Sequence, residues 1–135
     1  MIAYAKPLPL IDLLTKPYWD AAKQHRLIVQ RCASCGSFRF PIKPICNQCF
    51  SGTFGWHQMS GRAKVWSACE FYRQYFKGFE SDIPYNVALV QLEEGPRMYT
   101  NLIDIPYCDI TIGMAVKTCF EDVTDEVTLV KFRSE

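Results

Sequence analysis

The sequence lacks any long hydrophobic run. The best candidate, Val87–Val90, is interrupted by Gln91 after four residues, which is far short of the roughly 20 apolar residues of a membrane-spanning helix. Residues 1–10 also lack the charged start, apolar core and small-residue cleavage site of a secretory signal. We therefore expect a cytoplasmic protein with no membrane partner.

The chain also has little net charge. Its 135 residues include 15 Lys+Arg and 14 Asp+Glu, for a formal net charge of +1, so it shows no global basic excess of the kind that nucleic-acid binders carry. Hydrophobic residues make up 49% of the chain and aromatic residues 14%, which is enough for a packed core. The length suits one domain or two small modules, and it excludes a barrel enzyme or a two-domain dinucleotide-binding fold.

The near-zero charge conceals an asymmetry between the two parts of the chain. Residues 1–60 hold seven basic and two acidic residues, whereas residues 61–135 hold eight basic and twelve acidic ones, giving net charges of +5 and −4. The acidic second part argues against single-stranded nucleic acid lying across it. The basic residues of the first part suit a phosphate group, an acidic protein surface or a simple solvated rim.

Seven cysteines need an explanation, because disulfides are rare in a reducing compartment. Four of them, Cys32, Cys35, Cys46 and Cys49, form two C-x2-C knuckles separated by ten residues. Two such knuckles close a tetrahedral four-cysteine site, so the spacing predicts one structural Zn²⁺ with no open position for catalysis. A pair of redox motifs is the alternative, but the strand-to-helix turn typical of thioredoxin-like motifs is missing.

No catalytic residue is predicted. Cys69 and Cys119 fall in apolar strand patterns, where we expect small buried hydrophobic side chains, and Cys108 falls in a loop. A nucleophilic cysteine needs a base, and we expect His25 in a helix and His57 at a strand edge to serve packing or the surface. We therefore expect no activity from the chain alone.

The periodicity predicts a mostly β protein with an N-terminal helix. Thr15-Lys16-Pro17 is typical of a helix start, and this helix should run to about Arg26. Strands are expected at 27–31 and 38–40, and then at 62–72, 85–92, 97–103, 115–123 and 127–132. The last five favour a small closed OB-fold barrel over an open meander or an SH3-like barrel.

We accordingly divide the chain into three parts. Residues 1–26 form an N-terminal docking segment and helix, residues 27–57 a zinc ribbon, and residues 58–135 a five-stranded OB-fold barrel. A long loop at 73–84 is rich in aromatic side chains.

Several short segments, spread from residue 12 to residue 133, together form a recognisable pattern. They include Pro17-Tyr18-Trp19, Gln30-Arg31-Cys32, residues 44–49, Ser60-Gly61-Arg62, Pro84-Tyr85, residues 94–97, residues 120–122 and Lys131-Phe132. In these segments the chain resembles one known family, a rubredoxin-like zinc ribbon followed by an OB-fold, catalogued as domain of unknown function thirty-five. Ala63 departs from the pattern, because the family often has a second glycine there.

The resemblance implies a non-catalytic subunit of a thiolase-like acyl-CoA enzyme complex, of the 3-ketoacyl-CoA thiolase, acyltransferase or aldolase type. It implies a hetero-oligomer in which the helix and ribbon dock on the catalytic subunit while the OB-fold lies beside the channel for the CoA ester. The alternatives are a subunit of an acyl-CoA hydratase, a single-stranded nucleic-acid binding module, and a free-standing CoA-ester protein.

Two groups of residues are candidates for these contacts. A nucleotide with a pantetheine arm needs aromatic and proline surfaces with a few cations, and we expect these from Arg62, Tyr75, Phe76, Phe79, Pro84, Tyr85 and Arg97. The N-terminal segment is too apolar for a free tail, and its candidate docking residues are Leu13, Leu14, Tyr18 and Trp19.

Overall fold

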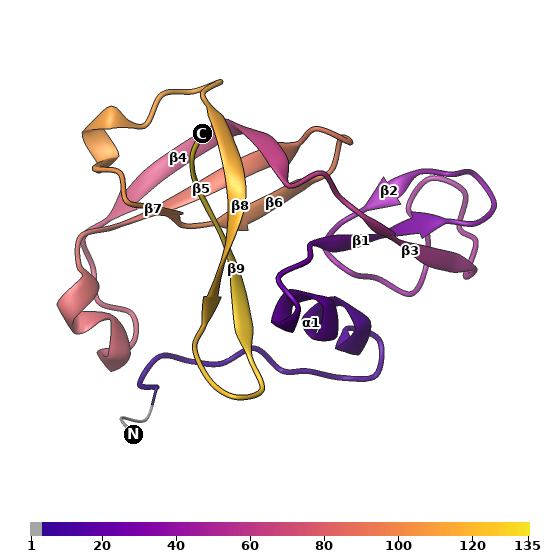
Figure 1. Cartoon of the computed structure of the whole chain (residues 1–135), viewed down its shortest axis with the longest axis horizontal. Helices are drawn as coiled ribbons and strands as arrows, with labels where there is room; N and C mark the ends of the chain where they lie inside the picture. Colours follow the sequence, from indigo (N-terminus) through magenta and orange to yellow (C-terminus); the bar gives the residue numbers. More distant parts are fainter. Residues whose placement is uncertain (1–3) are drawn as a thin grey trace.

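The computed structural model describes residues 4–135, which form one α-helix and two β-sheets (Figure 1). Helix α1 (Lys16–Lys23) leads into a three-stranded sheet of order β2-β1-β3, and a six-stranded sheet follows. The ribbon projects from one side of the larger sheet, and α1 lies below the ribbon and beside the larger sheet (Figure 1). The predicted mostly β class with an N-terminal helix is confirmed. No helix among residues 4–135 is long and apolar enough to cross a membrane.

Helix α1 starts with Pro17 in its first turn, as its sequence predicts. It ends at Lys23 rather than near Arg26, because His25 adopts a left-handed backbone with φ 58°. The N–H groups of Gln24 and Arg26 then bond back to the carbonyl oxygen of Ala21, each at 2.9 Å. These bonds satisfy carbonyl groups that a helix end would otherwise expose, so the chain turns directly into the ribbon.

The ribbon consists of β1 (Ile28–Cys32), β2 (Phe38–Arg39) and β3 (Phe54–Gln58), with β1 antiparallel to both neighbours. Gln30 is fully buried in β1 and connects it to the chain beyond β2. Its Oε1 accepts hydrogen bonds from Nε of Arg39 at 3.1 Å and from the backbone N–H of Lys43 at 2.9 Å. Its Nε2 donates to the carbonyl oxygen of Lys43 at 2.9 Å.

The OB-fold contains β4 (Arg62–Phe71), β5 (Tyr85–Leu92), β6 (Arg97–Thr100), β7 (Leu102–Ile103), β8 (Ala115–Asp122) and β9 (Thr128–Ser134). Short 3₁₀ helices occupy Lys77–Asp82 (η1) and Tyr107–Asp109 (η2) in its loops. The strand order is β6-β5-β4-β8-β9-β7, so the sheet is open, and the expectation of a closed barrel is wrong.

The predicted strand 97–103 is divided at Asn101. Residues before it pair with β5 in the antiparallel direction, while β7 after it pairs with β9 in parallel. The side chain of Asn86 replaces the strand ladder here, because its Oδ1 accepts from the N–H of Leu102 at 2.7 Å and its Nδ2 donates to the Leu102 carbonyl at 2.8 Å. The OB-fold therefore has six strands rather than the five predicted.

A β-bulge at Trp66 reverses the inward face of β4. Val65 pairs with Val90, but the next pair is Ser67 with Leu89, so one residue is inserted. Val65 is buried before the bulge, and Ala68 packs against the core after it. Cys69 is consequently exposed, which corrects the expectation that it is a buried hydrophobic residue, whereas Cys119 is half-buried.

One hydrophobic core joins the helix, the ribbon and the OB-fold. Tyr18 from α1 and Val29 from β1 lie in the same buried cluster as Val65, Val116 and Phe132 of the large sheet. Phe132 is the largest fully buried side chain. The ribbon is thus held against the OB-fold by shared apolar burial as well as by the connecting chain.

The N-terminal segment folds back along the OB-fold, passing β9 and approaching η1 (Figure 1). The ammonium group of Lys6 pairs with the carboxylate of Asp82 and lies 5.3 Å from the ring centroid of Phe79. A β-carbon at Gly78 would overlap the backbone of Ala5, so the close approach requires glycine. The predicted docking segment begins with residues 1–3, which lie outside the described residues.

Candidate metal centre and ligand cavities

The two cysteine knuckles have the same backbone. The N–H of Gly36 bonds to the carbonyl of Cys32, and the N–H of Phe50 bonds to that of Cys46, each at 3.0 Å. The fifth residue of each knuckle is left-handed, with φ 76° at Gly36 and 63° at Phe50. The same turn, used twice, aims four thiols at one point.

The four sulfur atoms have the spacing of a zinc site. Sγ of Cys32 lies 3.5 Å from Sγ of Cys49, and Sγ of Cys35 lies 3.7 Å from Sγ of Cys46. All four lie within 4.8 Å of one another. A tetrahedron with Zn–S bonds of about 2.3 Å has sulfur atoms about 3.8 Å apart, so the predicted ligand set fits the ion.

Hydrogen bonds favour negative charge on two of these sulfurs. The Ser37 hydroxyl and then the backbone N–H groups of Cys49 and Gln48 lower the pKa of Cys46 to about 5. The backbone N–H of Cys35 contributes most to lowering the pKa of Cys32.

The pKa of Cys49 moves the other way. The backbone N–H of Ser51 favours its thiolate, but the neighbouring sulfurs of Cys32, Cys35 and Cys46 outweigh that bond and raise the pKa to about 12. Four thiolates cannot gather here without a compensating cation, which is the electrostatic requirement that Zn²⁺ meets.

Three of the seven expected CoA-side residues line one cavity of about 580 Å³, which we call the loop cavity. Phe79 and Tyr85 stack at its wall with ring centroids 5.3 Å apart and an interplanar angle of 29°. Pro84 lies beside them, and Lys6 and Asp82 bring charge to the rim. Asp82, Glu70 and Glu121 also line the cavity, so it is not a cationic pocket.

The other four expected residues do not line this cavity. Tyr75 and Phe76 are exposed on the loop before η1, with the ring centroid of Phe76 lying 6.3 Å from that of Phe79. Arg97 lies on the outer face of the sheet, its Cζ atom 3.7 Å from the ring centroid of Trp66. The structure therefore keeps the aromatic loop residues near one another but separates Arg97 from them, because Arg97 lies against the exposed Trp66.

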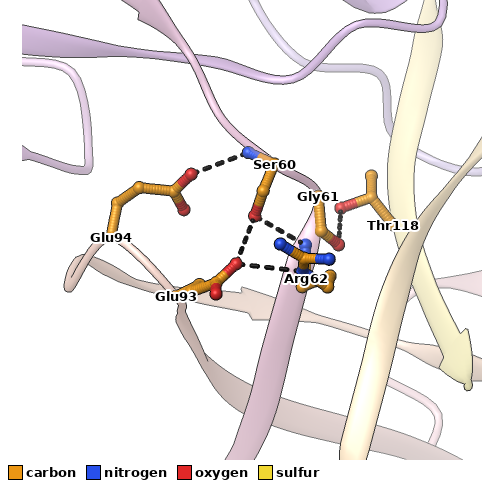
Figure 2. A network of polar contacts seen from close by, with 6 residues as sticks. All are labelled: Ser60, Gly61, Arg62, Glu93, Glu94 and Thr118. Carbon is orange, nitrogen blue, oxygen red and sulfur yellow. Dashed lines mark hydrogen bonds and ion pairs between the residues drawn. The ribbon is translucent and has the colours of Figure 1, made fainter.

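Arg62 is held in a polar network where the ribbon joins the OB-fold (Figure 2). Its Nε donates to Oε2 of Glu93 at 3.0 Å, and the Ser60 hydroxyl donates to the same oxygen at 3.0 Å. The Ser60 N–H donates to Glu94 at 2.7 Å, and the Thr118 hydroxyl to the Gly61 carbonyl at 2.9 Å. The bond from Arg62 is the largest cause lowering the pKa of Glu93. This arginine connects β4 to the β5–β6 turn.

Lys131 is a site residue that the sequence analysis did not single out. It lines the loop cavity and also a second cavity of about 420 Å³ between α1, the ribbon and β6, which we call the seam cavity. Its Nζ donates to Oδ1 of Asn101, and burial lowers its pKa. Its position between Val130 and Phe132 in an apolar strand was the available signal.

The four expected docking residues differ in exposure. Leu13 is 91% exposed, whereas Leu14 and Trp19 are half-buried. Tyr18 is buried, with its ring 5.0 Å from that of Trp19 and 5.7 Å from that of Phe40, and burial raises its pKa. Tyr18 thus packs in the core of this chain and lines the seam cavity, while Leu13 is the most exposed of the four.

Two family models match consecutive parts of the chain. One, described as the rubredoxin-like zinc ribbon domain of ChsH2, matches residues 19–55. The other, described as the C-terminal OB-fold domain of ChsH2, matches residues 56–121. Their boundary falls within β3, so the two modules follow each other as the sequence predicts.

Several known proteins resemble the chain over most of its length. A probable enoyl-CoA hydratase alpha subunit of Thermomonospora curvata is 39% identical over 130 residues, which are 95% of this chain but only 40% of that protein. A DUF35 domain-containing scaffold protein of Methanocaldococcus jannaschii is 33% identical over 119 residues, covering 87% of this chain and 84% of that protein.

A solved structure has the same fold. A chain of the Ltp2-ChsH2(DUF35) aldolase is 38% identical, with a TM-score of 0.84 over 94% of this chain and 98% of that one.

Proposed function

The chain belongs to the DUF35 family, and on that premise we propose that it is a non-catalytic, zinc-binding subunit of an acyl-CoA enzyme complex. The observation that carries the proposal is its likeness, over 94% of its length, to a chain of an assembly named as an aldolase. The relative from Thermomonospora curvata is likewise named as one subunit of a larger enzyme.

The contacts of its histidines favour a structural rather than a catalytic role for this chain. Within residues 4–135 no hydrogen bond joins a histidine to a cysteine, and His25 is engaged instead with the carboxylate of Asp122 at 3.1 Å. Its ring also stacks on Phe120 with centroids 5.0 Å apart. We therefore assign the nucleophile and base of the reaction to the partner subunit, which we propose is thiolase-like.

The zinc ion would be structural in this chain. Cys32, Cys35, Cys46 and Cys49 would hold one Zn²⁺, which joins the two knuckles and leaves no position for a substrate. The small ribbon sheet, with a β2 strand of two residues, gains its stability from that connection and from the core that it shares with the OB-fold.

The loop cavity is the proposed contact with the acyl-CoA ester. The stacked rings of Phe79 and Tyr85 offer apolar walls, while Lys131, whose Nζ is bonded to Asn101, offers a polar group beside them. This mixture suits an amide-bearing arm such as pantetheine. The acidic residues at the rim would repel phosphates, so we place the phosphate groups of CoA outside this cavity.

A hydratase subunit is the second candidate. It is favoured by the printed name of the relative from Thermomonospora curvata, of which this chain spans about 40%. The nucleic-acid alternative has no comparable support, because residues 61–135 carry a net charge of −4.

Co-expression tests the proposal. The tagged chain is produced with the thiolase-like and the hydratase-like proteins encoded nearest to its gene, and the mass of the purified assembly is measured. We expect a stable hetero-oligomer with a thiolase-like protein and no turnover of acyl-CoA by the chain alone. A chain that remains monomeric beside both proteins would overturn the proposal, and a complex with the hydratase-like protein alone would select the second candidate.

A further inference from the structure

Phe50 occupies a backbone position that favours glycine. The two knuckles share their hydrogen bonds, and the first knuckle has Gly36 where the second has Phe50. With φ at 63°, Phe50 lies in the left-handed region that a bulky L-residue rarely adopts. Gly36 completes the same turn without a side chain, so the Phe50 ring is not needed to build a knuckle.

The ring is also exposed to solvent. Phe50 has 77% of its surface accessible, and Ile45 on the same knuckle has 48%. Cδ1 of Ile45 lies 3.7 Å from the position of a β-carbon at Gly52, which places it against the chain that follows Phe50. We call Ile45 and Phe50 the knuckle knob. Its left-handed backbone and its exposed ring both make Phe50 unfavourable in the isolated chain. Residues with strained backbones concentrate at functional sites, and exposed apolar side chains that cluster mark interaction surfaces.

The ribbon that carries the knob has basic but no acidic side chains. The stretch from residue 21 to residue 69 contains no aspartate or glutamate. Arg31 donates from Nε to the carbonyl of Gly36 on the first knuckle at 3.0 Å, and Lys43 precedes Ile45 by two residues; both are exposed. A zinc–tetrathiolate centre would carry a net charge of −2 against the +3 of Arg31, Arg39 and Lys43, so residues 27–57 would keep a net charge of +1.

From this strain, exposure and charge we infer that Phe50 is the anchor by which this chain docks on its catalytic subunit. The ring inserts into an apolar pocket of that subunit, and carboxylates at the rim of the pocket pair with Arg31 and Lys43. Aromatic anchors seated in pockets dominate binding energy, and rim charges mainly set association rate and salt dependence. The inference rests on the proposed function, since it names the contact through which the proposed complex forms.

Substitution with glycine separates docking from folding. Phe50→Gly removes the ring and relieves the left-handed strain, so we expect a thermal midpoint at or above that of the wild type and an unchanged zinc content. The dissociation constant of the complex should nevertheless rise by about 30-fold or more, as for an anchor residue. Phe50→Asp should weaken binding at least as much.

A matched control is available on the OB-fold. Ile112, which is 63% exposed, lies outside the ribbon, and Ile112→Asp should leave the dissociation constant within about two-fold. Arg31→Glu with Lys43→Glu should slow association and reduce its dependence on salt.

Three results would overturn the inference. Wild-type affinity in Phe50→Gly, with the wild-type complex intact, would show that the proposed function stands and that docking uses another surface. A lower thermal midpoint or lost zinc in Phe50→Gly would show that the ring supports the knuckle instead. Failure of the wild-type chain to bind any catalytic subunit would remove the proposed function, and the inference would fall with it.

Discussion

Replacing Gln30 with leucine should destabilise the ribbon through Arg39. Gln30 is fully buried and makes three hydrogen bonds, two with the backbone of Lys43 and one that accepts from Arg39 Nε. Arg39 is itself buried, and its two terminal nitrogens have no hydrogen-bond partner among the described residues. Among residues 4–135, this cation is held by Gln30 and by the ring of Phe54, whose centroid lies 5.0 Å from Cζ.

The expected magnitude follows from these contacts. Two neutral hydrogen bonds contribute about 0.5–1.5 kcal/mol each, and a bond to a charged group about 1.5–3 kcal/mol. Burial of the leucine side chain returns about 1.5 kcal/mol. We therefore expect Gln30→Leu to lower the free energy of unfolding by about 1–4.5 kcal/mol. Gln30→Leu with Arg39→Met should recover at least about 1 kcal/mol, because the double variant no longer buries an unpaired charge.

Urea unfolding of the zinc-loaded chain, followed by tryptophan fluorescence, measures both values. Trp56 lies in β3 of the ribbon and reports on it directly. A Gln30→Leu variant within about 0.5 kcal/mol of the wild type would refute the role of the hydrogen bonds. If the double variant loses as much unfolding free energy as the two single variants lose together, the buried unpaired charge of Arg39 is not what destabilises Gln30→Leu.

Three further predictions address the core, the metal and pH. Phe132→Ala should lower the free energy of unfolding by about 3–5 kcal/mol because the ring is fully buried, whereas the exposed Phe76→Ala should change it by less than about 0.5 kcal/mol; similar losses in both would contradict the core. Purified chain should hold one zinc ion, and Cys46→Ser or a chelator should release it and melt the ribbon; a metal-free chain with an unchanged melting curve would contradict the zinc site. The Thr128 hydroxyl and then His25 lower the pKa of Asp122 from 3.8, so its contribution to stability is complete above that value and is lost as pH falls through the folded pKa. Asp122→Asn should therefore flatten the acid limb of the stability curve relative to Asp125→Asn, and equal slopes would speak against this pairing.

The cysteine cluster and the order of the secondary-structure elements were predictable because they depend on the local sequence. The spacing of four cysteines encodes a tetrahedral site, and Pro17 marks the start of a helix. The strongly apolar residues 85–92 likewise indicate a strand, which appears as β5.

Long-range contacts explain what the sequence did not predict. The bulge at Trp66 inserts one residue and exposes Cys69, and no local pattern distinguishes it from continuous alternation. Asn86 divides the predicted third strand through bonds to Leu102, 16 residues away. Tyr18 is buried only because the ribbon and OB-fold close over α1.

The candidate ligand residues were dispersed for the same reason. Phe79, Pro84 and Tyr85 are near one another in sequence and remain together in the loop cavity. Arg62 is occupied by Glu93 from the following hairpin, and Arg97 lies on the outer face against Trp66. Lys131 lines the cavity from β9. The candidates predicted from the sequence came from the aromatic loop and nearby arginines, so this distant lysine was not among them.

The mass of the assembly formed with the neighbouring thiolase-like protein tests the central claim most directly. Native mass spectrometry of the co-purified sample should show both chains in fixed proportion, with one zinc ion for each copy of this chain, and acyl-CoA turnover only when the thiolase-like chain is present. A monomeric chain beside an active thiolase-like enzyme that lacks it would contradict the account.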